Sequence, residues 1–128
     1  MPKMQKGNKM RKITRKGIIR KLDTLAKEKI FERDGRRCVT CGDYATDPGH
    51  LFTRRGYSTR WNLINIFPQC RACNIRHEQD PYPLMEYFRN RFGQKIYDDL
   101  HTKAKTVHKG AWKTWELEEL YNQLNDKL

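Results

Sequence analysis

Long apolar runs are missing from this sequence. No stretch approaches the roughly 18 apolar residues of a membrane-spanning helix, and the opening segment MPKMQKGNKM lacks the apolar centre of a secretory signal peptide. These absences exclude a membrane protein and predict a cytoplasmic one. The chain has 128 residues, of which 37% are hydrophobic and 33% are charged. We therefore expect one small domain whose modest core needs the help of a metal ion.

Acidic residues are missing from the N-terminal end of the chain, where no aspartate or glutamate precedes Asp23. Because this end is rich in lysine and arginine, residues 1–21 are predicted to form a flexible basic arm. The formal net charge of +12 predicts a polyanionic partner, and nucleic acid fits because binding releases counterions from its phosphates. A solvated tail, and a charge that serves only solubility, remain as alternatives. The arm residues predicted to contact DNA are Lys12, Arg15 and Lys16.

Cysteine is scarce too, and all four cysteines belong to two Cys-x2-Cys pairs, Cys38 with Cys41 and Cys70 with Cys73. In a reducing compartment this spacing is more typical of zinc ligands than of disulfides. Four thiolates complete a tetrahedral Zn2+ site and leave no open position, so the zinc is predicted to be structural. The 28 residues between the pairs exceed what a simple zinc ribbon needs, which predicts an inserted hairpin.

Periodicity and turn residues predict an α+β fold in which the order is knuckle, strand, strand, helix. The zinc-clamped core is expected over residues 22–80 and a helical extension over 81–128. The last segment is amphipathic, and the sequence leaves open whether it packs on its own domain or forms a homodimer. The predicted elements are a helix over Leu22–Arg33, strands over Gly49–Arg54 and Trp61–Phe67 with a loop at 56–59 between them, a helix starting at the second cysteine pair, and helices within 81–93, 94–108 and 111–128.

The segment between the cysteine pairs holds residue types that are typical of a catalytic site. His50 falls near the end of the first predicted strand, and a neutral imidazole suits a general base near pH 7. We expect it to converge with three asparagines, two on the second strand and one after the last cysteine: Asn62, Asn65 and Asn74. The arginines around the hairpin are predicted phosphate clamps, with ordinary solvated charge as the alternative. They are Arg54, Arg55 and Arg60.

These residues stand in a pattern: C-x2-C, D-x-G-H, R-[WF]-N-x2-N and Q-C-x2-C-N. The pattern resembles the phage NinG (Rap) recombination endonuclease family, a branch of the HNH or His-Me finger nucleases. The matching stretches are Cys38–Cys41, Asp47–His50, Arg60–Asn65 and Gln69–Asn74, and the resemblance covers roughly Phe31 to His77. It implies a ββα-metal core and a DNA endonuclease selective for branched DNA or Holliday junctions in phage recombination, acting in the host cytoplasm.

The resemblance also implies roles for these residues. His50 would be the general base, Asn65 would hold it in orientation, and Asn62 is the fallback for that part. Asn74 stands where many HNH enzymes have a histidine, so the chain would be an H-N-N variant in which an amide oxygen binds catalytic Mg2+ or Mn2+.

Two further metal ligands are less well defined by the resemblance. HNH enzymes commonly have an acid directly before the base, where this chain has Gly49. Asp47 would supply the missing carboxylate, although a turn role suits it as well. His77 would add a metal or phosphate contact, with a surface histidine as the alternative.

Three other functions remain open at this point. One is an HNH nicking endonuclease of broad specificity, and a second is a non-catalytic zinc-knuckle protein that only binds DNA. The third is a protein-interaction adaptor that uses the acidic C-terminal helix. The spacing of His50 and the asparagines favours an enzyme, because a DNA-binding knuckle gives no reason for it.

Overall fold

The computed structural model describes residues 13–53, 55–105 and 112–126. Over these ranges the fold is α+β, mostly helical with a two-stranded antiparallel sheet. The elements are α2 (Arg15–Asp34), β1 (Asp47–His50), α3 (Tyr57–Arg60), the 3-10 turn η1 (Leu63–Asn65), β2 (Ile66–Gln69), α4 (Arg71–Arg76), α5 (Tyr82–Phe92), α6 (Gln94–Lys105) and α7 (Thr114–Asp126). No helix in the described ranges is long and apolar enough to cross a membrane.

Helix α2 begins earlier than the sequence predicted. Its N-cap is Thr14, whose side chain accepts a hydrogen bond from the backbone N–H of Gly17. The buried side chains of Ile18 and Leu22 hold the first turns against the rest of the protein. Residues 15–21 of the predicted flexible arm are therefore helical, and this part of the prediction is corrected. Residues 1–12 of that arm lie outside the described residues.

The two strands are shorter than predicted and lie closer to the cysteine pairs. β1 and β2 pair in a register that places Asp47 opposite Gln69 and His50 opposite Ile66. The predicted loop at 56–59 is largely helical, since α3 begins at Tyr57, and η1 precedes β2. The prediction that Asn62 and Asn65 lie on a strand is thus wrong.

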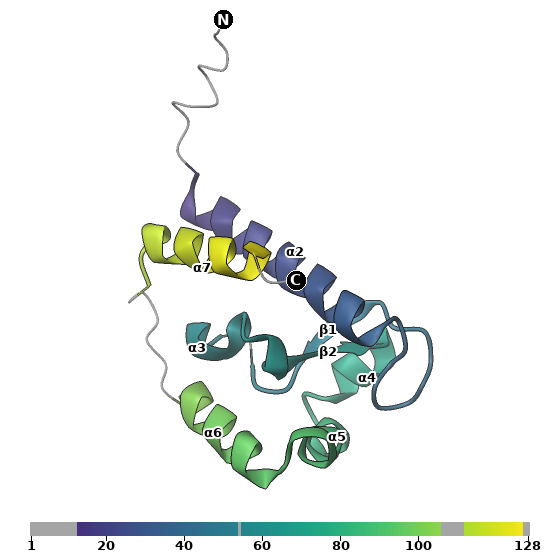
Figure 1. The fold of residues 1–128 in the computed structure, drawn as a ribbon. Helices are drawn as coiled ribbons and strands as arrows, with labels where there is room; N and C mark the ends of the chain where they lie inside the picture. Colours follow the sequence, from purple (N-terminus) through teal and green to yellow (C-terminus); the bar gives the residue numbers. More distant parts are fainter. Residues whose placement is uncertain (1–12, 54, 106–111, 127–128) are drawn as a thin grey trace, which may run out of the picture.

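Two apolar clusters lie on the two sides of the sheet, and β2 contributes to both. Ile66 belongs to the cluster shared with α2 and α7, and the next residue, Phe67, belongs to the cluster shared with α5 and α6. This follows from the alternation of side chains along a strand. Figure 1 shows α2 and α7 on one side of the hairpin and α5 and α6 on the other.

The C-terminal helix packs against its own chain. Leu117 and Leu124 of α7 are buried in the cluster that includes Ile18 and Leu22 of α2, and the two helices lie side by side in Figure 1. Trp115 remains 59% exposed on the outer side. The apolar face of α7 is therefore used within the domain, while a homodimer through this helix stays a prediction.

Candidate functional site

The four cysteines meet at one point, as predicted from their spacing. Their sulfur atoms all lie within 4.8 Å of one another, and the sulfurs of Cys41 and Cys70 are 3.7 Å apart. Tetrahedral zinc with Zn–S bonds of about 2.3 Å places its sulfurs about 3.8 Å apart. None of the cysteines forms a disulfide. The cluster could therefore hold a metal ion such as zinc.

Tight backbone turns hold both halves of this cluster. In the first pair, the N–H of Cys38 donates to Asp43 (2.7 Å) and the N–H of Gly42 donates to Cys38 (2.9 Å). Gly42 has a φ of 88°, which favours glycine. In the second pair, Cys70 caps α4 and its sulfur accepts a hydrogen bond from the N–H of Cys73. The ligands are thus fixed by local structure.

The thiols differ in how readily they ionise. Burial would raise the pKa of Cys38, but hydrogen bonds from the Thr40 hydroxyl and from backbone N–H groups lower it to about 6. At Cys41, the backbone N–H of Asp43 favours the thiolate, yet desolvation and the neighbouring cysteines raise the pKa to about 12. Four thiolates this close repel one another, and a bound cation removes that repulsion.

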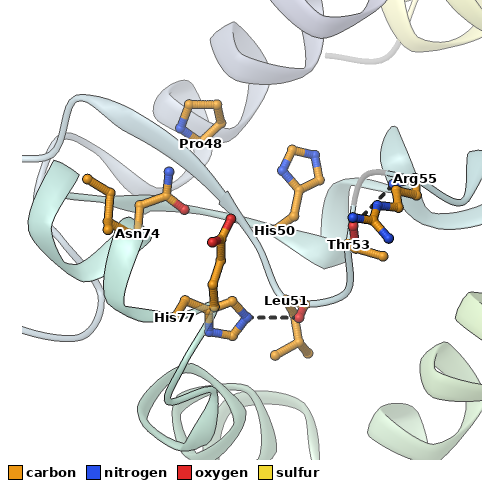
Figure 2. A pocket seen from close by; sticks show the side chains of 9 residues that line it. Pro48, His50, Leu51, Thr53, Arg55, Asn74 and His77 are labelled. Carbon is orange, nitrogen blue, oxygen red and sulfur yellow. Dashed lines mark hydrogen bonds between the residues drawn. The ribbon is translucent and has the colours of Figure 1, made fainter.

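A second polar centre adjoins α4, which contributes Asn74 and Ile75 to it. It is a pocket of about 610 Å³, in which the side chains of His50, Asn74 and His77 surround the opening (Figure 2). The remaining lining residues are Pro48, Leu51, Thr53, Arg55, Ile75 and Glu78. The structure thus brings the predicted base and the last predicted asparagine to one pocket.

His50 is the last residue of β1, and its ring is held in a fixed orientation. Its Nε2 lies 3.0 Å from the carbonyl oxygen of Arg60. Because a carbonyl only accepts hydrogen bonds, Nε2 must carry the proton, and Nδ1 is then the nitrogen with the lone pair. The ring of His50 is thus anchored to α3, and the side chain lines the pocket.

Asn65 lies outside the pocket lining and is fully buried. Its side-chain nitrogen donates to the carbonyls of Phe52 and Thr59, both at 3.0 Å, and its side-chain oxygen accepts from the N–H of Phe52 at 2.9 Å. These bonds connect the end of β1 to α3, which carries the Arg60 carbonyl. Asn65 therefore shapes the backbone that orients His50. Asn62 instead caps η1, by accepting from the N–H of Ile64 at 3.2 Å.

Asp47 does not line the pocket, because it faces the opposite way from His50 along β1. Its carboxylate accepts hydrogen bonds from Arg71 at 2.9 and 3.3 Å and from the Asn74 side-chain nitrogen at 3.2 Å. Burial would raise the pKa of Asp47, but hydrogen bonds from Arg71, Thr46 and Asn74 lower it. The structure thus places Asp47 as a support for Asn74, whose amide nitrogen it holds so that the amide oxygen is left as an acceptor.

His77 and Glu78 complete the pocket beyond the end of α4. The Nε2 of His77 donates to the carbonyl of Leu51 at 2.9 Å, and its Nδ1 is buried without a hydrogen-bond partner. Glu78 was not predicted as a site residue. Its position four residues after Asn74 was a usable signal, since residues at that spacing share one side of a helical turn.

The predicted DNA contacts are spread over the surface. Arg55 lines the pocket, whereas Arg60 forms a two-point ion pair with Asp23, with Nε and Nη2 at 3.1 and 2.7 Å from the carboxylate oxygens. Arg15 donates to the carbonyl of Trp112 at 2.7 Å. Lys16 is exposed on α2. The two other predicted contacts, Lys12 and Arg54, lie outside the described residues.

Comparison of the chain with protein-family models, with curated proteins and with solved structures found no match. The resemblance to the NinG family therefore rests on the motif residues alone. In the part of the chain that the structure describes, the cysteine cluster is the one group of three or more His, Cys, Asp or Glu side chains that could hold a metal.

Proposed function

We propose that this protein is a metal-dependent endonuclease of the HNH type that hydrolyses DNA phosphodiesters, with His50 as the general base. The observation that carries the proposal is the orientation of His50. Its Nε2 is hydrogen-bonded to the Arg60 carbonyl, and its side chain lines a pocket that Asn74 and Glu78 also line. A general base held in one tautomer removes a proton from water more effectively than a mobile surface histidine.

The donor set of the pocket fits a hard divalent cation. The amide oxygen of Asn74 and the carboxylate of Glu78 are oxygen ligands of the kind that Mg2+ and Mn2+ prefer. Mg2+ commonly takes only one or two carboxylates from the protein and completes its shell with water and phosphate oxygens. When bound, such an ion stabilises negative charge on the scissile phosphate and on the leaving oxygen.

The side chains of the chain itself would divide the remaining tasks. His50 would accept the proton of the attacking water, and Arg55 at the edge of the pocket would bind a phosphate. Asp47 would hold the Asn74 amide, because it accepts a hydrogen bond from the amide nitrogen. Arg60, which forms an ion pair with Asp23, would position the backbone carbonyl that bonds His50.

The cysteine cluster would play a separate, structural part. Zinc held by four thiolates has no open position for water or substrate, so it would stabilise the knuckles without entering the reaction. By the NinG resemblance, the substrate would be branched DNA such as a Holliday junction. A nicking enzyme of broad specificity would have the same catalytic groups.

The test is cleavage of a labelled four-way junction and of a matched linear duplex, each with Mg2+, with Mn2+ or with no added divalent ion. We expect metal-dependent cutting, with a loss of about 10²- to 10⁴-fold in His50→Ala and a strong loss in Glu78→Gln. Gln79→Ala, in the same exposed turn, is the matched control and should cut normally.

Each outcome separates the competing functions. Cutting of the junction alone supports the resolvase, and equal cutting of both substrates supports the nuclease of broad specificity. Binding of DNA without cutting under any metal condition would instead identify a zinc-knuckle DNA-binding protein. His50→Ala that cuts at the wild-type rate would remove the proposed base, provided that DNA binding and zinc content are unchanged.

A further inference from the structure

The outer face of the first cysteine knuckle carries an aromatic ring next to two arginines. The knuckle is a short hairpin closed by backbone hydrogen bonds, among them one from the N–H of Ala45 to the carbonyl of Arg36 at 2.8 Å. Arg37 and Tyr44 form an isolated antiparallel bridge. Residues directly opposite each other in such a pair have neighbouring side chains on the same face.

Tyr44 is held at the surface rather than packed. It is 67% exposed, although it is a large aromatic residue and only 37% of the chain is hydrophobic. Together with Arg36 and Arg37 it lines an open hollow of about 360 Å³, separate from the pocket of His50. The ring is thus available to a ligand from solvent.

The two arginines are fixed but not neutralised. The guanidinium of Arg36 lies 4.3 Å from the ring centre of Phe31, and Arg37 donates to the carbonyl of Gly42 at 3.1 Å. Neither arginine forms an ion pair with a carboxylate in the described part of the chain. The hollow therefore combines positive charge with a flat aromatic surface, and this combination fits a nucleotide with an accessible base.

We propose that this hollow binds an unpaired nucleotide of DNA, with its base stacked on Tyr44 and its flanking phosphates bound by Arg36 and Arg37. In an intact duplex the bases are stacked on each other, and only the phosphates can reach the arginines. A single strand, a splayed end or a branch point offers both groups. The inference rests on the proposed function for DNA as the partner. It adds that the protein recognises an unpaired nucleotide in that DNA.

The attachment of the knuckle to the core makes this a preorganised surface. The cysteine cluster ties the hairpin to α4, and the N–H of Val39 donates to the carbonyl of Pro68 in β2 at 3.0 Å. Little conformational entropy is then lost when a base stacks on the ring. Stacking of one base on an aromatic side chain changes affinity by about 5- to 150-fold.

The test measures binding of a labelled single-stranded oligothymidine and of a blunt duplex by fluorescence anisotropy, without added divalent ions so that nothing is cut. Tyr44→Ala and Tyr44→Leu should each weaken binding of the single strand by about fivefold or more, while duplex binding is unchanged. Tyr44→Phe keeps the ring and should stay within about twofold of the wild type. Tyr82→Ala is the matched control, since Tyr82 is 57% exposed on α5, and it should behave as wild type.

Two results would overturn the inference: unchanged single-strand binding by Tyr44→Ala, or an equal loss on single strand and duplex. Melting temperature and zinc content show that each variant is folded. The outcome is separable from that of the proposed function. Tyr44-dependent binding without any cleavage retains the inference and rejects the nuclease, whereas cleavage with no effect of Tyr44 rejects the inference alone.

Discussion

The cysteine cluster and the His50 pocket share helix α4 but are built on opposite principles. Cys73 is buried in the cluster, and the next residue, Asn74, lines the pocket. The cluster consists of four cysteines placed by local turns, and their four sulfur atoms could complete the coordination of a metal ion such as zinc. The pocket of about 610 Å³ combines an imidazole, an amide and a carboxylate from different segments of the chain. Under the proposed function, the closed site would stabilise the fold and the open one would carry out the hydrolysis.

The largest expected effect comes from comparing these neighbours on α4 directly. Cys73→Ser removes one thiolate, and because structural zinc contributes about 10–16 kcal/mol in small zinc domains, we expect loss of the folded core. Asn74→Ala should leave the melting temperature within a few degrees of the wild type but reduce metal-dependent cleavage. Circular dichroism, bound zinc and cleavage rate are the three measurements.

Chelation gives an independent check on the same contrast. A chelator that strips zinc from the wild type should abolish the cooperative melting transition, and added zinc should restore it. A Cys73→Ser protein that melts like the wild type would show that the cluster does not hold the fold together.

The second prediction concerns the buried asparagine between the two centres. Asn65→Ala removes the side chain that pairs with the carbonyl and the N–H of Phe52, while the carbonyl of Thr59 keeps a hydrogen bond from the N–H of Asn62 at 3.2 Å. Each unsatisfied buried group costs about 1–3 kcal/mol, so the melting temperature should fall by several degrees or more. Cleavage should fall as well, since the backbone that orients His50 loses its support. Equal stability of Asn65→Ala and wild type in urea unfolding would refute this role.

Asn62→Ala is the comparison for this variant. Its side chain makes the single capping bond to Ile64, so the expected cost is about 0.5–2 kcal/mol. A larger loss of cleavage in Asn62→Ala than in Asn65→Ala would reverse the order that the hydrogen bonds indicate.

The difference between the cysteine cluster and the His50 pocket also explains which features of the fold could be predicted from the sequence. The Cys-x2-Cys spacing brings the two sulfur atoms of each pair together in a local turn. The meeting of Cys38, Cys41, Cys70 and Cys73 was therefore predicted, and it is confirmed. Helix α5 likewise follows from a proline at its start and Gly93 at its end, with φ of 94°. Both features depend on residues that lie close together in the chain.

The features that the sequence did not predict depend on contacts between residues far apart in the chain. The β-rich run from Trp61 to Phe67 was predicted as a strand, but Asn62 caps a 3-10 turn there. The buried side chain of Asn65, at the end of this turn, bonds backbone groups six and thirteen residues away. The ion pair of Arg60 with Asp23, 37 residues earlier, was not predicted either, and phosphate binding by Arg60 stays a prediction. No local pattern encodes either contact.

The third prediction tests whether α2 reaches the pocket through Arg60. The carboxylate of Asp23 accepts from both Arg60 and the indole N–H of Trp61, at 2.7 Å in each case. In Asp23→Asn the Arg60 backbone should shift enough to misplace the carbonyl that orients His50. We expect kcat to fall roughly tenfold with KM unchanged, a smaller loss than removal of the base itself.

Glu28→Gln provides the matched control, because Glu28 is an exposed acid on the same helix. It should leave kcat unchanged. If both variants lose the same activity, or if Asp23→Asn changes only KM, the effect belongs to the overall charge of α2 and not to the orientation of His50.

The smallest expected effect concerns Asp34, which joins α2 to α5 away from both centres. Its carboxylate pairs with Arg33 at 2.6 Å and with Arg91 at 2.9 Å, and its side chain is 9% exposed. Burial alone would raise the pKa of Asp34, but hydrogen bonds from Arg33 and Arg91 lower it. A lowered folded-state pKa contributes stability that is complete above the unfolded value near 4, and this stability is lost as the pH falls through the folded value.

The pH dependence of stability distinguishes the contribution of the Asp34 ion pairs from that of the cysteine cluster. Asp34→Asn should destabilise the protein by about 1 kcal/mol, and the difference from wild type should be equal at about pH 7 and about pH 5, since both lie above the titration of Asp34. Thiolate ligands compete with protons over that range, so protonation of the cluster would destabilise both proteins alike and leave the difference between them unchanged. Urea unfolding at the two pH values makes the comparison. A wild type that gains stability relative to Asp34→Asn as the pH falls from about 7 to about 5 would place the folded pKa of Asp34 above its ordinary value, and the pairing with Arg91 would then contribute no stability.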